Sequence, residues 1–176
     1  GRRALARLGD KLSKLQQLNF SNNPVLGKAD PEASDEELQW GEAPPGLVRC
    51  SLDACVASSV VSELALKLSM LEELDLRSSL DGPGLVVLLE ALADDNRLRS
   101  LNLGYCHIEG EDGGRACASI CSRARALEHL SLAGNFALRT PGLKALVAGL
   151  PGTLAWRSFN VSGCTLDGAE AGEAIA

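Results

Sequence analysis

Short apolar motifs recur along this chain, each with the pattern leucine, two variable residues, leucine, one variable residue, leucine. The three clearest copies occupy residues 71–76, 98–103 and 127–132. Three weaker copies, in which Phe, Cys, Trp or Val replaces a leucine, occupy residues 15–20, 47–52 and 156–161. The end of each motif alternates apolar and polar residues, which is the pattern of a strand with one buried face. The motifs therefore predict six short strands.

A residue that can hydrogen-bond to nearby backbone follows each motif, three positions after its last apolar residue. These residues are Asn23, Cys55, Ser79, Cys106, Asn135 and Cys164. Such side chains satisfy backbone groups that a turn leaves unpaired, so we expect them to close the turn after each strand. Cys50 replaces a core leucine in its own motif. Four of the six cysteines are then framework residues rather than redox or metal-binding residues.

Between the motifs the apolar spacing becomes helical. The four stripes are Val60, Val61, Leu64 and Leu68; Leu85, Leu88, Leu89 and Leu92; Cys117, Ile120, Cys121 and Ala124; and Leu143, Leu146, Val147 and Leu150. Pro83 and Pro141 sit near predicted helix starts, where a missing N–H costs little. The segment 149–152, Gly-Leu-Pro-Gly, predicts a helix end. Strands and helices should therefore alternate along the chain.

These motifs resemble the leucine-rich repeat family, whose signature is L-x-x-L-x-L-x-x-N/C-x-L, and the resemblance covers essentially the whole chain. Most of its repeats are 27 to 29 residues long, which looks like the ribonuclease-inhibitor subclass. The resemblance implies an α/β solenoid, a right-handed horseshoe segment with a parallel concave sheet and convex helices. It also implies one domain over residues 1–176, with about six strand-helix repeats and both ends truncated.

Three segments are less regular. Residues 27–46 carry six acids and one lysine, and they predict either a short helix ending near Trp40 or a disordered acidic loop. Ala4, Leu5, Leu8 and Leu12 suggest the helix of a repeat whose strand is missing. Residues 167–175 suggest a helix that begins and is then cut. Neither end has the polar cap of a finished solenoid.

A parallel arrangement of the strands places their polar residues in outward columns. The first column is Gln17, Arg49, Glu73, Ser100, His129 and Ser158, the middle is Asn19, Ser51, Asp75, Asn102, Ser131 and Asn160, and the third is Ser21, Asp53, Arg77, Gly104, Ala133 and Ser162. Binding surfaces favour Arg, Tyr and Trp, so the candidate partner-binding residues are Arg49, Glu73, Asp75, Arg77, Tyr105 and His129. The alternative is a solvated face whose mixed charges only keep it soluble. Trp156 is expected in the core, and Trp40 is left open between an anchor and a packed residue.

Several function classes are disfavoured. A net charge of −6 gives no electrostatic case for nucleic acid. No apolar run is long enough for a membrane span, and no nucleophile, phosphate-loop, zinc or dinucleotide motif is present. We therefore expect no enzyme, no cofactor and no metal. His107 follows Cys106, but neighbours in a turn should point apart. The cysteine pattern suits a reducing, intracellular location.

The resemblance implies a scaffold that binds another protein or peptide through its concave face. Activation of a small GTPase and substrate recruitment for a ubiquitin ligase are the alternatives within the same family. The oligomeric state stays open, as does the identity of the partner.

Overall fold

The computed structural model describes residues 14–23, 47–54, 70–93, 96–153 and 155–175. Six strands and four helices are defined in these ranges. They are β1 (Gln17–Asn19), β2 (Arg49–Ser51), β3 (Glu73–Asp75), α4 (Gly82–Ala91), β4 (Ser100–Asn102), α5 (Gly110–Arg123), β5 (His129–Ser131), α6 (Arg139–Gly149), β6 (Ser158–Asn160) and α7 (Gly168–Ile175). The expectations for residues 4–12, 27–46 and 60–68, and for Cys55, lie outside the described residues.

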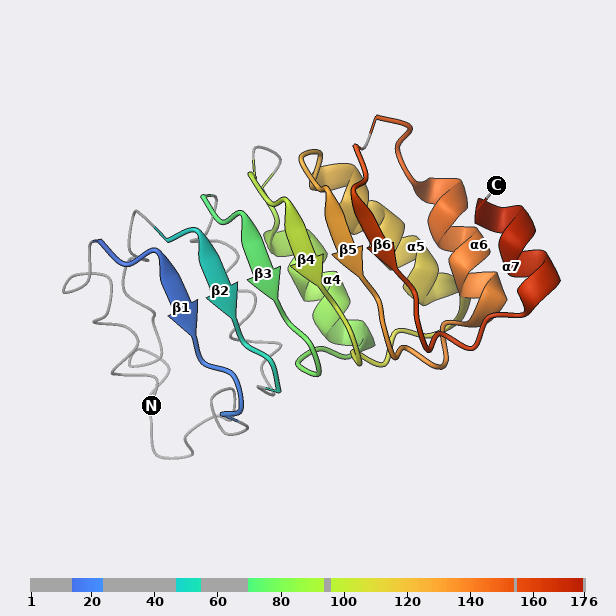
Figure 1. Cartoon of the computed structure of the whole chain (residues 1–176), viewed down its shortest axis with the longest axis horizontal. Helices are drawn as coiled ribbons and strands as arrows, with labels where there is room; N and C mark the ends of the chain where they lie inside the picture. Colours follow the sequence, from blue (N-terminus) through green and yellow to red (C-terminus); the bar gives the residue numbers. More distant parts are fainter. Residues whose placement is uncertain (1–13, 24–46, 55–69, 94–95, 154, 176) are drawn as a thin grey trace.

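All six strands form one parallel sheet in the order β1-β2-β3-β4-β5-β6. Each strand pairs with the next in chain order, and the aligned motifs are in register, so that Leu74 pairs with Leu101 and Leu101 with Leu130. The helices α4 to α7 lie behind the sheet as a second layer (Figure 1). This is the α/β horseshoe predicted from the motifs.

Backbone hydrogen bonds extend the ladder beyond the three-residue strands. The N–H groups of Leu76 and Leu103 donate to the carbonyls of Asn102 and Ser131, one rung further on. In the turn that follows, the N–H groups of Ser78 and Tyr105 donate in the same way to Gly104 and Ala133. Because consecutive rungs pair from the strand into the turn, each rung is fixed by its neighbours rather than by local propensity.

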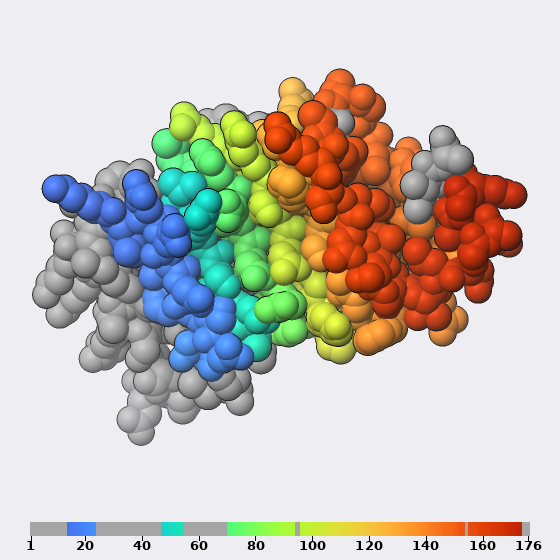
Figure 2. Space-filling model, viewed as in Figure 1, coloured from blue at the N-terminus to red at the C-terminus, as the bar shows by residue number. Residues whose placement is uncertain are grey.

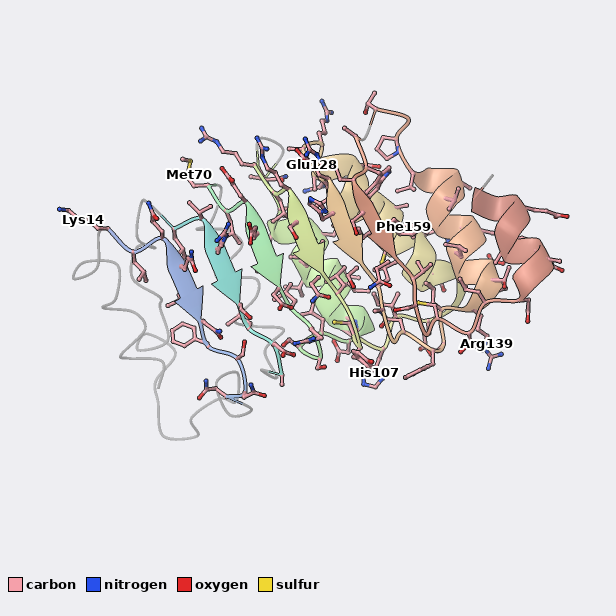
Figure 3. The ribbon with its side chains drawn as sticks, in the orientation of Figure 1. Lys14, Met70, His107, Glu128, Arg139 and Phe159 are labelled. Atoms are coloured by element: carbon pink, nitrogen blue, oxygen red, sulfur yellow. The ribbon has the colours of Figure 1, made fainter. Side chains whose placement is uncertain are left out.

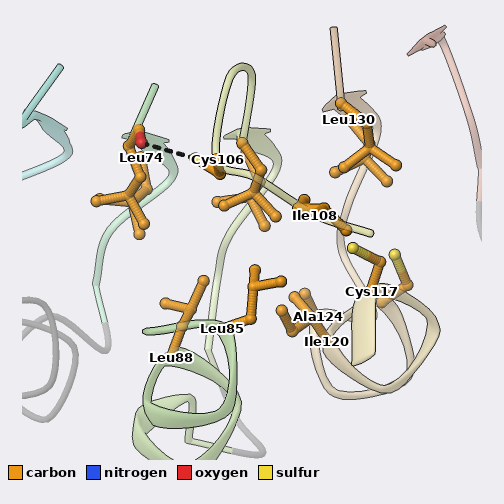
Figure 4. Close-up of a cluster of buried hydrophobic side chains, with 14 of the residues drawn as sticks. Leu74, Leu85, Leu88, Cys106, Ile108, Cys117, Ile120, Ala124 and Leu130 are labelled. Carbon is orange, nitrogen blue, oxygen red and sulfur yellow. Dashed lines mark hydrogen bonds between the residues drawn. The ribbon is translucent and has the colours of Figure 1, made fainter. Parts of the chain in front are cut away.

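The core lies between the sheet and the helices. Leu74, Leu101 and Leu130 point inward from the strands and are at most 7% exposed. Figure 4 shows Leu85 and Leu88 of α4 and Ile120 of α5 packed opposite the strand side chains. Among the described stripes, the predicted inward positions are buried, apart from Leu89, Val147 and Leu150, which are partly buried and pack against the core. The leucines are interior residues, as the alternation predicts.

The buried turn positions among the described residues behave as predicted. Asn135 is 1% exposed, and its Nδ2 donates to the carbonyls of Leu103 and Leu132 at 2.9 and 2.6 Å. Its Oδ1 accepts from the N–H groups of Cys106 and Ile108 at 2.9 and 3.1 Å. These four hydrogen bonds join two successive turns through one buried side chain.

Ser79, Cys106 and Cys164 also bond to the preceding rung, with fewer hydrogen bonds, whereas the exposed Asn23 bonds within its own turn. The Sγ of Cys106 donates to the carbonyl of Leu76 and that of Cys164 to the carbonyl of Leu132, both at 3.2 Å. The hydroxyl of Ser79 donates to the carbonyl of Leu52. A buried thiol or hydroxyl in this position therefore replaces asparagine as the donor to the preceding rung.

The residue before each turn position has a left-handed backbone. Asn22, Ala54, Ser78, Tyr105, Gly134 and Gly163 all have φ between 55° and 74°. Only glycine adopts this conformation without steric cost, and Gly134 and Gly163 provide it in the last two rungs. The helix boundaries also follow the sequence, since Pro83 lies in the first turn of α4 and α6 ends at Gly149.

Candidate functional site

The outward side chains of the strands form the face opposite the helices. The register places Arg49, Glu73, Ser100 and His129 side by side in one column. It places Ser51, Asp75, Asn102 and Ser131 in the next column. We call this surface the concave face, and Figure 2 shows its rungs crossing the molecule in sequence order. The first and middle of the three predicted columns are present, and the residues of the third lie past the strand ends, in the turns.

Four charged residues of this face form two ion pairs. Arg49 Nε lies 2.9 Å from Glu73 Oε1 across β2 and β3. Arg77 Nη2 lies 2.7 Å from Asp53 Oδ2, and this hydrogen bond, together with the charge of Asp53, raises the pKa of Arg77 above its ordinary value. The described part of the face over β2, β3 and the turns after them carries two cations and three carboxylates, so it is polar and close to neutral. Exposed pairs of this kind contribute little to stability.

The middle column is ordered by its own backbone. The Oδ1 atoms of Asp75, Asn102 and Asn160 accept from the N–H two residues further on, at 3.1, 3.0 and 2.9 Å. Because Oδ1 is occupied in this way, the Nδ2 groups of Asn102 and Asn160 are the donors that these residues can offer to a ligand. Among the described residues, no hydrogen bond from either Nδ2 group is formed within the chain.

A shallow hollow of about 400 Å³ lies over β1 to β4. Arg49, Glu73 and Asp75 line it together with Ser100 and Asn102. Asp75 and Glu73 are therefore brought together as predicted. His129 is exposed on β5, two strands from β3, and does not line this hollow.

An exposed aromatic pair lies at the rim where the strands end. Tyr105, in the turn after β4, is 51% exposed, and Phe136, in the turn after β5, is 61% exposed. Their ring centroids are 6.2 Å apart in an edge-to-face arrangement. A Cβ on Gly134 would lie 2.4 Å from the Tyr105 ring, so the ring covers this glycine. We call Tyr105 and Phe136 the aromatic rim.

Phe136 is the residue that the sequence analysis missed. It directly follows Asn135, which is buried, and three of the four described turns with a buried turn residue expose the next residue, Leu80 after Ser79 being the exception. That alternation was a usable signal. The same rule did work for Cys106 and His107, since Cys106 is buried and His107 is exposed.

Trp156 lies with the core, as predicted. It is partly buried, packs against the core cluster and contacts Phe159 with ring centroids 5.9 Å apart. Figure 3 labels Phe159, which lies on β6, and Glu128, which directly precedes β5. The Trp156 side chain therefore has a structural role in the rung that contains β6.

The five described cysteines are buried and form no disulfide with one another; they are Cys50, Cys106, Cys117, Cys121 and Cys164. Burial raises the pKa of Cys121 to about 12, and burial followed by the neighbouring thiols raises the pKa of Cys117 still further. Burial also raises the pKa values of Cys106 and Cys164. At neutral pH these groups are thiols, which are poor nucleophiles and poor metal ligands.

Two further observations concern the described ranges. No three His, Cys, Asp or Glu side chains in those ranges are arranged to hold a metal ion. None of the helices there combines the length and apolar character that crossing a membrane requires.

Comparison with known proteins identifies a family match. Residues 96–114, which include β4 and the start of α5, match a family model described as a leucine-rich repeat. A search of curated proteins finds no match. Domains of this family are generally protein–protein interaction modules without enzymatic activity. The match and the six-rung parallel sheet together support a leucine-rich repeat family for this chain.

Proposed function

We propose that this chain binds another protein or a peptide through the concave face and the aromatic rim. The observation that carries the proposal is the exposed pair Tyr105 and Phe136. The chain has one Tyr, three Phe and two Trp. Two of these six aromatic residues therefore lie together on the solvent-exposed surface. Large aromatic side chains are enriched at protein interfaces and supply much contact area at low entropic cost.

The energetics favour contact at this rim. An aromatic side chain covers roughly 150–250 Å². Because Tyr105 is 51% exposed and Phe136 is 61% exposed, about half of this area on each ring is available for burial. At about 25 cal/mol per Å², covering that area contributes roughly 2–3 kcal/mol per ring. The turns beneath the rings are held by the ladder of backbone hydrogen bonds, so little order has to be gained on binding.

The concave face supplies polar recognition beside this apolar anchor. Arg49, Glu73, Asp75 and Arg77 present ordered charges, and Asn102 adds an amide donor. His129 is the remaining predicted contact, on β5 between these charges and β6. A partner that lies across β2 to β5 would touch all of these residues.

The repeat length and the helices between the described strands support the ribonuclease-inhibitor-like subclass as part of this proposal. The free, buried thiols support an intracellular location, since cysteines of secreted proteins are usually paired. A role as a small-GTPase regulator or as a ubiquitin-ligase arm would be a special case of partner binding, and no residue in the described ranges favours either one.

The test is partner capture with a matched pair of variants. Tyr105→Ala/Phe136→Ala removes the aromatic rim, while Val86→Ala removes an equally exposed apolar side chain from α4, at 49% exposure. Proteins captured from cell extract should be retained by Val86→Ala and depleted about tenfold or more by the double variant. Thermal unfolding should stay within a few degrees of the parent, because both rings are half exposed.

A second pair tests the charged face. Asp75→Ala and Arg77→Ala should each weaken the same interactions by a smaller factor, about three- to tenfold. Capture that is unaltered by both changes and by loss of the aromatic rim would overturn the proposal. Equal depletion by Val86→Ala would also overturn it, because the loss would then not be specific to this face.

A further inference from the structure

The loops that lead into the last three strands carry a row of arginines. Arg97 and Arg99 precede β4, Arg125 precedes β5, and Arg157 precedes β6. All four side chains are exposed. We call this set the arginine edge, and it lies at the opposite end of the strands from the aromatic rim. Figure 3 shows side chains ending in nitrogen projecting from the edge at which Glu128 is labelled.

One carboxylate organises two members of the arginine edge. Glu128 Oε2 lies 2.7 Å from Arg157 Nε, and Glu128 Oε1 lies 3.4 Å from Arg99 Nη1. The arginine side chains remain 71% and 58% exposed, whereas that of Glu128 is 20% exposed. A guanidinium has five N–H donors, so each arginine keeps most of its donors for another acceptor. In particular, the two Nη groups of Arg157 present a fork that fits a carboxylate.

Arg97 and Arg125 have no ion pair in the described part of the chain. Arg123 differs, since its Nη1 donates to the carbonyl of Leu92 at 3.1 Å and so ties the end of α5 to the end of α4. Glu128 is the one described carboxylate in the loops leading into β4, β5 and β6. Asp94 and Asp95 lie outside the described residues. The edge thus presents more positive charge than its own contacts neutralise.

The opposite edge is richer in carboxylates. Glu109, Glu111, Asp112 and Asp167 are exposed there, near the starts of α5 and α7, beside two exposed arginines, Arg115 and Arg139. The two edges of the sheet therefore differ in charge, although the whole chain carries −6. A polyanion as long as nucleic acid would meet the acidic parts as well, whereas a short acidic segment can contact one edge alone.

The spacing suits such a segment. Arg99 and Arg157 hold the same position on strands two rungs apart, so their backbones are about 10 Å apart, from a strand spacing of about 4.8 Å. Carboxylates two or three residues apart on an extended peptide are about 7–10 Å apart. Long arginine side chains cover the remaining difference.

We infer that the arginine edge binds an acidic segment of a partner protein, a run rich in Asp and Glu. This surface is separate from the aromatic rim, and the inference does not depend on the function proposed above. Glu72 occupies the equivalent position before β3, so the binding surface begins at β4.

Binding of a fluorescent octaglutamate peptide tests the inference directly. The chain should bind it at about 20 mM salt and lose most of the binding at about 0.5 M salt, because exposed charges are screened. Arg99→Gln/Arg157→Gln should weaken the affinity about tenfold, and adding Arg97→Gln/Arg125→Gln should remove it. Far-UV circular dichroism checks that each variant is folded.

The matched control is Arg115→Gln, which removes an exposed arginine that pairs with Glu111 and Asp112 near the opposite edge. Its affinity for octaglutamate should equal that of the parent. Three results would overturn the inference: no binding at low salt, equal loss with Arg115→Gln, or tighter binding to a single-stranded oligonucleotide of the same charge. Loss of octaglutamate binding with retained partner capture by the aromatic rim would separate the two surfaces.

Discussion

The inward positions of β3, β4 and β5 are all leucine, whereas the outward positions beside them differ on every rung. Leu74, Leu101 and Leu130 are at most 7% exposed and pair in register. The outward neighbours in the first column are Glu73, Ser100 and His129. One face of the same strand is thus repeated, and the other face varies.

Packing explains the difference. A core between a sheet and its helices tolerates little change in volume, so each rung needs nearly the same side chain in the same place. An outward side chain meets solvent and one neighbour on each side, so many residues fit. Variation in the outward columns can therefore serve recognition, while the inward columns hold the solenoid together.

The comparison predicts its largest contrast within a single strand. Leu130→Ala should lower the free energy of unfolding by about 3–4 kcal/mol, because Leu130 is 2% exposed and its removal leaves a cavity. His129→Ala, on the adjacent outward position, should change it by less than about 0.5 kcal/mol. Urea denaturation measures both. Similar losses for the two variants would mean that the two faces are not distinct.

A second contrast lies in the turns, between a buried and an exposed asparagine. Asn135→Ala should cost about 2–3 kcal/mol, because it leaves buried donors and acceptors of two turns unpaired. Asn23 is exposed and its Nδ2 donates to the carbonyls of Phe20 and Ser21, so Asn23→Ala should cost about 0.5 kcal/mol. Urea denaturation measures the free energy of unfolding of both variants. An equal loss for Asn135→Ala and Asn23→Ala would mean that the buried hydrogen bonds of Asn135 do not add to stability.

Two turn glycines with positive φ, Gly134 and Gly163, provide a third comparison, because Gly134 lies beneath the aromatic rim. Gly134→Ala should cost about 2 kcal/mol, because φ is +74° and the new Cβ would press against the Tyr105 ring. Gly163 has φ of +69° but its nearest neighbours would lie 3.4 Å from a Cβ, so Gly163→Ala should cost about 1 kcal/mol. Thermal unfolding gives the difference. A larger loss for Gly163→Ala would contradict the placement of the Tyr105 ring.

The buried thiols predict how stability depends on pH. The pKa of Cys121 is raised to about 12 in the folded chain, so the unfolded thiol ionises first, near its ordinary value of 9.0. Stability is therefore fully present below pH 9 and falls as pH rises from 9 toward 12, by about 1.4 kcal/mol per pH unit for each such thiol. Cys121→Ala should reduce this slope by one thiol. An unchanged slope between pH 9 and 10 would show that Cys121 is not protected.

Much of the fold could be predicted because the same apolar motif recurs in each repeat of the sequence. The L-x-x-L-x-L motifs fixed the strands, their register and the inward leucines, and the turn residues Cys106 and Asn135 were identified by spacing alone. Helix α5 was harder, since its inward stripe is narrow and uses Cys117 and Cys121 in place of leucine. Small buried side chains give a weak hydrophobic signal even where they pack closely.

The candidate site was predicted less completely, for physical reasons. The pairing of Arg49 with Glu73 follows from the register, but that of Arg77 with Asp53 depends on how long side chains cross the turn. Phe136 was missed because its turn was considered only for backbone closure by Asn135. The arginine edge was missed because its members are spread over residues 97–157 and meet only when three rungs stack.

Cysteine cross-linking across the outward column tests the central claim that the six motifs are adjacent rungs of one sheet. Ser100 and His129 are register partners on neighbouring strands, so their Cα atoms are about 5 Å apart, within reach of a disulfide. Ser131 lies two residues beyond the register partner of Ser100, so the Cα atoms of Ser100 and Ser131 are about 8 Å apart, which is beyond the reach of a disulfide. Under mild oxidation, Ser100→Cys/His129→Cys should lose about two daltons in native mass spectrometry, while Ser100→Cys/Ser131→Cys should not. Failure of the first pair, or equal cross-linking of both, would contradict the stacked rungs on which both proposed binding surfaces depend.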